Sequence, residues 1–368
     1  MRQKQITRVF AMMVIALMLI PQTTLAVKIP VAILRTNADG KTKTLTFTYA
    51  ERPKVFSKNG RDGIHPLNKL GSPGQESLPS WFPQISGFID EYNNHNITTV
   101  IFNKAFAQAR PNTLALWFYH MRNLKTIQGI ENLNTSNAES MYGMFEGCSS
   151  LETIDVSKFN TAKVKFFYRM FAGCTNLKEI DVSNFDTSKA IGLMSMFEGC
   201  ENLTSLDLSG FNLANADLLG FMFKGCSNLK SIDISSFNTL GANLNSMFMG
   251  CSSLTSLDIS QLKFDNVRWM NQFLADCPKL STLIVGNNAL NNLSRTDFGG
   301  NTIEKEKQIG NAFRNVGTFD SPCLLIVEDS FDKTVLGVKH KNNSEGFYRW
   351  HGGYFKLSSD NAKSGINQ

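Results

Sequence analysis

Residues Leu177 to Asn202 form the stretch LKEIDVSNFDTSKAIGLMSMFEGCEN, which is one unit of the repeat that decides the fold. Its first part, Leu-x-x-Ile-Asp-Val-Ser, alternates apolar and polar residues, and this alternation predicts a β-strand. Its later part carries apolar residues at three-residue steps, as on one face of a short helix or of tight helical turns: Ile191, Met194, Phe197 and Cys200. Gly199 is expected to end that segment in the left-handed conformation.

The same unit recurs with nearly constant spacing. Steps of 26, 26, 26, 25 and 26 residues separate six cysteines, namely Cys148, Cys174, Cys200, Cys226, Cys251 and Cys277. A leucine follows three residues after each cysteine, and Met-Phe precedes five of them. One such unit cannot bury its apolar side alone, but stacked units share a continuous core. The sequence therefore predicts an α/β solenoid: a right-handed coil of the leucine-rich-repeat type with a parallel β-sheet face.

Degenerate units extend this array toward the N-terminus. Leu124 and Ile97 continue the leucine column at steps of 27 residues, and Trp117-Phe118 and Met121 occupy the places of Met-Phe and Cys. Beyond Val285 the period breaks. We expect a solenoid at residues 96–290, a cap at 27–95 with a β-hairpin over 28–50 and a loop over 51–83, and a β-rich C-terminal cap with a polar tail at 291–368.

The first residues resemble a secretory signal peptide. Residues 1–26 combine a positive start (Arg2, Lys4, Arg8) with an apolar run that is too short for a mature membrane anchor. We expect cleavage after Ala26 and a secreted or cell-surface protein with no transmembrane helix in the mature chain. Removal of this segment lowers the net charge from +6 to +3, which argues against nucleic acid as a partner.

The cysteine column has three interpretations. Metal sites need ligands a few residues apart in one loop, and neither the cysteines nor the five histidines have that spacing. Disulfides between neighbouring coils are possible where the Cα atoms approach within about 7 Å. A column of small buried side chains is the interpretation that the spacing favours, as it is for the methionine and phenylalanine columns.

A row of acidic residues is the candidate binding surface. Strand alternation directs the aspartates of the repeat outward, with a serine two residues after each: Asp155, Asp181, Asp207, Asp233, Asp258, Ser157, Ser183, Ser209, Ser235 and Ser260. Carboxylates so close together need solvent, hydroxyl donors or a cation. Local hydrogen bonding is one interpretation, and binding of a basic protein segment or of Ca²⁺ is the other. The row ends where Gln128 and Ile284 replace aspartate.

The segments Leu133 to Val164 and Ser195 to Asn212 resemble the 26-residue repeat of the BspA-like leucine-rich-repeat surface proteins of bacteria. The similarity runs from about Ile97 to Val285. The hairpin AILRTNADGKTKTLTF and the closing FYRWHGGYF (Phe347 to Phe355) are similar to flanks of Bacteroidales relatives. This resemblance implies a secreted or surface adhesin-like protein that binds proteins or glycans on host cells, extracellular matrix or other bacteria.

Two other functions compete with adhesion. The aromatic segment near the C-terminus, which includes Trp350, suggests a carbohydrate-binding scaffold, although a closing strand of the cap is the favoured interpretation of this segment. A secreted hydrolase is the less favoured alternative, because the chain has neither a Gly-x-Ser-x-Gly elbow nor a His-Glu-x-x-His motif. We therefore expect a protein that is not an enzyme and has no resident cofactor.

Overall fold

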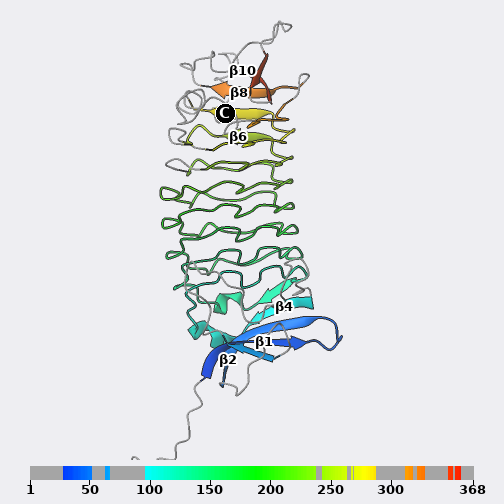
Figure 1. Ribbon diagram of the computed structural model, residues 1–368, viewed down its shortest axis with the longest axis vertical. Coiled ribbons are helices and arrows are strands. Elements are labelled where there is room, and N and C mark those ends of the chain that lie inside the picture. The colour runs from blue at the N-terminus through cyan, green and yellow to red at the C-terminus, as the bar shows by residue number, and fades with distance from the viewer. Residues whose placement is uncertain are drawn as a thin grey trace, which may run out of the picture.

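The computed structural model describes residues 28–51, 63–66, 96–237, 243–262, 267, 269–286, 311–317, 321–327, 347–350 and 353–357. The repeats stack along the long axis of the molecule, with the N-terminal hairpin at one end and the C-terminal strands at the other (Figure 1). This arrangement is solenoid-like, as the sequence predicts; its handedness stays a prediction. The predicted signal peptide and the polar tail lie outside the described residues.

Each repeat returns through consecutive tight turns rather than through a helix. Two residues in every turn segment, four positions apart, have positive φ, and eight such pairs follow one another: Leu116/His120, Gly143/Gly147, Arg169/Gly173, Ser195/Gly199, Phe221/Gly225, Ser246/Gly250, Gln272/Asp276 and Asn311/Asn315. A left-handed residue cannot continue an α-helix of L-residues. Gly199 therefore has the predicted conformation, and of the two predicted alternatives for the return, a short helix or tight turns, the structure has the tight turns.

The positive φ values serve hydrogen bonding between neighbouring coils. In one coil the amides of Leu193, Ser195, Phe197 and Gly199 donate to the carbonyls of Leu218, Gly220, Met222 and Lys224 in the next, over 2.7 to 3.0 Å. Alternate amides thus point toward the following coil, where an α-helix would direct them to its own fourth preceding carbonyl. Among the described residues only short 3₁₀ helices occur, η3 (Lys104–Gln108) and η4 (Ile130–Asn132).

The turn segments bury a column of stacked aromatic rings. Ring centroids of Phe118, Phe145, Phe171, Phe197, Phe223 and Phe248 follow one another at 5.1 to 5.9 Å, all five pairs stacked. Phe248 then meets Phe273 edge to face at 5.5 Å. Such pairs contribute about 0.5–1.5 kcal/mol each beyond the burial of their area. The predicted assignment of the Met-Phe column, and of Trp117-Phe118 in an early coil, to the core is confirmed.

The cysteines form a second buried column, and all seven are free thiols. Each repeat thiol donates to the carbonyl of a phenylalanine in the preceding coil: Cys148 to Phe118, Cys174 to Phe145, Cys200 to Phe171, Cys226 to Phe197, Cys251 to Phe223 and Cys277 to Phe248, over 3.1 to 3.2 Å. The buried-column interpretation is confirmed, and the disulfide alternative is not seen. A thiol suits this place because it is small and apolar and still donates a weak hydrogen bond.

Regular β-sheet, with both parallel and antiparallel pairs, occurs toward the two ends of the array. At the N-terminal end the strand order is β3 (Gly63–Pro66), β1 (Lys28–Thr36), β2 (Lys43–Glu51), β4 (Ile97–Phe102) and β5 (Thr126–Gln128). At the other end it is β6 (Ser256–Asp258), β7 (Thr282–Val285), β8 (Cys323–Val327), β10 (Gly353–Leu357) and β9 (Phe347–Trp350). Between these sheets the strand-like segments of the central coils follow the same path without forming a strand ladder.

The N-terminal hairpin continues the sheet beyond the first coil. β1 and β2 pair antiparallel, which confirms the predicted hairpin, and β2 pairs parallel with β4. The predicted loop over residues 51–83 is partly wrong, because β3 pairs antiparallel with the other edge of β1. Ile64 lies opposite Ile33 in that pairing. The edge of β1 that faces away from β2 is therefore paired with β3, whereas a loop over residues 51–83 would leave it open.

The structure reveals a further coil that its sequence does not show. Asn311 and Asn315 repeat the positive φ values of Gln272 and Asp276, and the carbonyls of Ala312 and Arg314 accept from the preceding coil. β8 then adds a parallel strand to β7. The period therefore does not end at Val285; an insertion between residues 286 and 311 hides the next unit, in which Ala312 and Val316 take the places of Met and Cys while Phe313 keeps the place of Phe.

The face assigned to one unit also needs correction. Leu193, Met196, Phe197 and Cys200 are buried, whereas Ile191 is 41% exposed and Met194 only half-buried. Three-residue steps overestimate burial here, because side chains in a chain of turns do not follow the period of a helix.

Alanine substitutions at the glycine column test the positive φ values. Gly199→Ala is expected to destabilise the protein by about 1–2 kcal/mol, the cost of a left-handed L-residue. A new Cβ there would meet only Gly173 at an ordinary 3.7 Å. Gly147→Ala should cost more, because its Cβ would lie 2.8 Å from the His120 ring. Urea unfolding of both variants provides the measurement, and equal losses at the two sites would contradict the packing argument.

Thiol reactivity tests the cysteine column. Burial raises the pKa of Cys174, Cys226 and Cys277 to about 12 and that of Cys148, Cys200 and Cys251 well above 9.0. Because the thiolate is the reactive form, a disulfide reagent such as Ellman's should label none of these groups in the folded protein at pH 8. After denaturation all seven cysteines of the chain should react. Rapid native labelling of two or more repeat thiols would refute this picture.

Candidate functional site

The predicted acidic row lies on the surface of the sheet side. The carboxylates of Asp155, Asp181, Asp207, Asp233 and Asp258 are all exposed. Thr153, Glu179, Ser205, Ser231 and Ser256, two residues earlier in each coil, are exposed on the same face. The outward direction of the aspartates agrees with the alternation of the sequence, since Val156, Val182, Leu208, Ile234 and Ile259 behind them are buried.

Each aspartate holds the turn that follows it. Oδ1 accepts a hydrogen bond from the backbone amide two residues later, at Ser157, Ser183, Ser209, Ser235 and Ser260, over 2.8 to 3.0 Å. In the second of these coils the Ser183 hydroxyl also donates to Asp181 Oδ1 at 2.6 Å. The side chain takes an amide that a strand would direct to its neighbour, which explains why the strand-like segments stop at this point. The predicted local hydrogen bonding is therefore confirmed for one oxygen, Oδ1, of each carboxylate.

These hydrogen bonds lower the pKa of four carboxyl groups of the row. The side-chain and backbone hydrogen bonds of Ser183 lower the pKa of Asp181 from its usual 3.8, although Asp207 and Asp155 oppose this effect electrostatically. The backbone amide and hydroxyl of Ser209 likewise lower the pKa of Asp207. The pKa of Asp155 and of Asp233 is lowered by their own serines. The row is therefore negatively charged at neutral pH.

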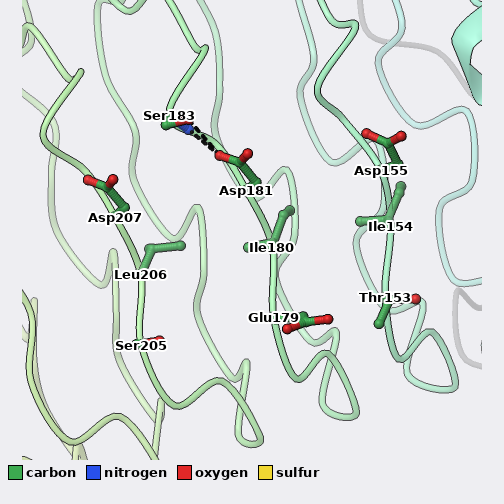
Figure 2. Close-up of a pocket in the computed structure, with 10 residues that line it drawn as sticks. All are labelled: Thr153, Ile154, Asp155, Glu179, Ile180, Asp181, Ser183, Ser205, Leu206 and Asp207. Carbon is green, nitrogen blue, oxygen red and sulfur yellow. Dashed lines mark hydrogen bonds between the residues drawn. The ribbon is translucent and has the colours of Figure 1, made fainter.

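Three adjacent coils form a shallow depression of about 650 Å³ on this face. Figure 2 shows its three rows: Asp155, Asp181 and Asp207; then Ile154, Ile180 and Leu206; then Thr153, Glu179 and Ser205. Ile154 is half-buried, and Ile180 and Leu206 are nearly buried. The depression therefore offers an apolar strip between an acidic row and a polar row.

The acidic row ends as the sequence predicts. Gln128 at the end of β5 is exposed in the upstream position, and Ile284 of β7 pairs with Asp258 of β6 in parallel register. Of the described residues, no three histidine, cysteine or acidic side chains converge as the ligands of a metal ion would. Binding of Ca²⁺ to the row, and binding of any partner, stay predictions.

The terminal aromatic segment is only partly described. Phe355 of β10 is fully buried and packs edge to face against Phe313 at 5.5 Å, so this ring belongs to the core. The side chain of Trp350 lies outside the described residues. β10 pairs with β8 and β9, as a closing strand would.

The surface of the turn segments carries a further feature that the sequence alone did not predict. A chain of parallel bridges aligns Phe166, Gly192, Leu218, Asn243 and Trp269 in one column. Trp269 is the more exposed of two large apolar side chains that lie open to solvent in the described part of the chain. This column has the 26-residue spacing but no common residue type, so no residue pattern in the sequence marks it. Only the position of these residues within the repeat identifies the column.

Acid titration tests the electrostatics of the row. A carboxyl whose folded pKa is lowered adds stability above its unfolded value of 3.8, and this contribution is lost as the pH falls through the folded pKa. Carboxyl groups titrate between about pH 5 and pH 2. Over this range the triple variant Asp181→Asn, Asp207→Asn, Asp233→Asn should therefore lose less thermal stability than the wild type. Melting temperatures measured across that range decide, and a variant curve as steep as that of the wild type would contradict the assignment.

Comparison with known proteins places the chain in a family. The family described as "Mycoplasma protein of unknown function, DUF285" matches residues 112–231 and 192–308. A leucine-rich repeat protein from Bacteroides ovatus is similar at 14% identity over 69% of each chain, with a TM-score of 0.30. No curated protein matches significantly. The described residues include no helix of the length and hydrophobicity that crossing a bilayer requires. The predicted kinship with BspA-like repeat proteins is confirmed, and the chain belongs to the DUF285 family of repeat proteins.

Proposed function

We propose that this protein is a non-enzymatic binding module that acts outside the cell and docks a basic segment of a partner protein on its acidic sheet face. The observation that carries the proposal is the depression over three coils, where Asp155, Asp181 and Asp207 border the apolar strip of Ile154, Ile180 and Leu206. The signal-peptide pattern of residues 1–26 supports export. Host cells, matrix and other bacteria offer partners of this kind, which would make the protein an adhesin.

Lysine and arginine side chains fit both properties of the depression. Their methylene stems can lie on the apolar strip while the charged end reaches a carboxylate. Each aspartate uses Oδ1 for its own turn, so Oδ2 is the oxygen that a ligand would reach. Neighbouring coils of a stacked sheet lie about 4.8 Å apart, so two steps match the roughly 9.3 Å between positions i and i+3 of an extended polyproline II segment.

Exposed ion pairs are weak singly, so the proposed affinity depends on repetition. Each solvated pair contributes about 0.2–1 kcal/mol. Contacts at three or more coils add, and salt screens them. Binding by this face is therefore expected to weaken steeply as ionic strength rises.

The triple Asn variant tests the proposal. A synthetic peptide with lysine at every third position serves as the probe, and its affinity for the full-length chain is measured by calorimetry. The substitutions Asp181→Asn, Asp207→Asn and Asp233→Asn should weaken binding about tenfold, as expected for the loss of several exposed pairs. The fold should persist, because the Asn Oδ1 still accepts the serine amide.

Asp186→Asn is the matched control. Asp186 also holds a turn, by accepting from the Ser188 amide at 2.9 Å, but it does not line the depression. This variant should bind like the wild type. Equal affinity of the triple variant and the wild type, or an equal loss in the control, would rule out the acidic face as the docking site.

A further inference from the structure

Trp269 lies open to solvent on the turn side of the array. Its side chain is 42% exposed, and its backbone bridges to Asn243 in the preceding coil. Exposing so large an apolar ring forfeits the stabilisation that its burial would give. Its position in the stack does not require a tryptophan, since equivalent positions in this column hold threonine, serine and glycine.

Three asparagines lie around this position in two consecutive coils. Asn243 is the bridging partner of Trp269, Asn245 follows two residues later, and Asn271 follows two residues after Trp269. All three are half-buried. A neutral aromatic ring is thus combined with three neutral amides, whereas the same column farther toward the N-terminus carries Phe166 and Leu218.

Two of the three amides are fixed by the backbone. Asn243 Oδ1 accepts from the amide of Asn245 at 3.0 Å, and Asn245 Oδ1 accepts from the amide of Asn271 at 2.9 Å. Within the described residues, no side-chain nitrogen of these three asparagines donates a hydrogen bond. The donors of Asn243 and Asn245 are therefore held in place before a ligand arrives, which lowers the entropic cost of binding.

We propose that Trp269 and these asparagines bind a neutral carbohydrate, independently of the acidic sheet face. A sugar ring has an apolar C–H face, which stacks on an indole, and a rim of hydroxyl groups, which accept from amide donors and donate to amide oxygens. Apolar ring and uncharged amides are the groups that this ligand class needs. A protein partner that buried the indole would leave the amide donors unsatisfied unless it supplied acceptors at each of them.

Affinity electrophoresis of the full-length chain tests the proposal. Native gels containing laminarin, yeast mannan or arabinogalactan serve as neutral probes, and polygalacturonate serves as an anionic probe. At least one neutral polysaccharide should retard the wild type. Trp269→Ala should weaken that binding about tenfold or more, as expected for an aromatic anchor that becomes buried beneath its ligand. Trp269→Phe, which keeps an aromatic face, should retain most of it.

Two further variants make the result specific. Asn271→Asp removes the amide donors without changing the size of the side chain and should weaken binding severalfold. Ile191→Ala truncates the other exposed apolar side chain and should bind like the wild type. Circular dichroism melts check that each variant is folded; Asn271→Asp and Trp269→Phe decide the matter if Trp269→Ala does not fold.

Several outcomes overturn the proposal. They are an absence of retardation in all three neutral gels, retardation by polygalacturonate alone, or unchanged glycan binding by both Trp269→Ala and Asn271→Asp. If the Trp269 and Asn271 variants lost binding to a protein but kept their glycan binding, the surface would be assigned to protein recognition instead. The triple Asn variant of the acidic face should keep its glycan affinity, so failure of one site is distinguishable from failure of the other.

Discussion

Hydrogen bonds that run from each turn segment to the next are the constraint on which the structure depends. Alternate amides in these segments must point along the stack, and this direction requires two residues of positive φ in each coil. Glycine occupies the second of these positions in the central coils, whereas Arg169 and Ser195 have positive φ at the first position. The phenylalanine and cysteine columns then fill the interior that this backbone encloses, and each thiol bonds to a carbonyl of the preceding coil.

The same constraint creates the surfaces. Because equivalent residues of successive coils lie one step apart, any residue type that recurs with the period becomes a continuous row. On the sheet side, recurrence of aspartate produces a charged row beside the apolar strip of Ile154, Ile180 and Leu206. On the turn side, the column from Phe166 to Trp269 varies from coil to coil, so its chemistry is local.

Sequence periodicity was sufficient for the parts that recur. The buried columns, the outward aspartates and the N-terminal hairpin follow from spacing and alternation, because burial in a stack repeats with the unit. Backbone conformation was less accessible: apolar residues at three-residue steps suggest a helix, yet the left-handed Ser195 and Gly199 rule one out. The coil at residues 311–317 was not predicted because an insertion precedes it and because it lacks the Met and Cys of the repeat. Trp269 was not predicted because its column has the repeat spacing but no common residue type.

The two proposed sites are physically separable. Repeat arrays transmit interactions chiefly between neighbouring coils. The acidic depression lies on coils that contribute residues 153–207, whereas the Trp269 cluster lies on coils that contribute residues 243–271 and faces the turn side. Substitutions at sites so separated and without shared contacts are expected to act additively. A charged protein segment and a neutral glycan could therefore occupy one molecule together, and each new coil in such an array supplies both faces at once.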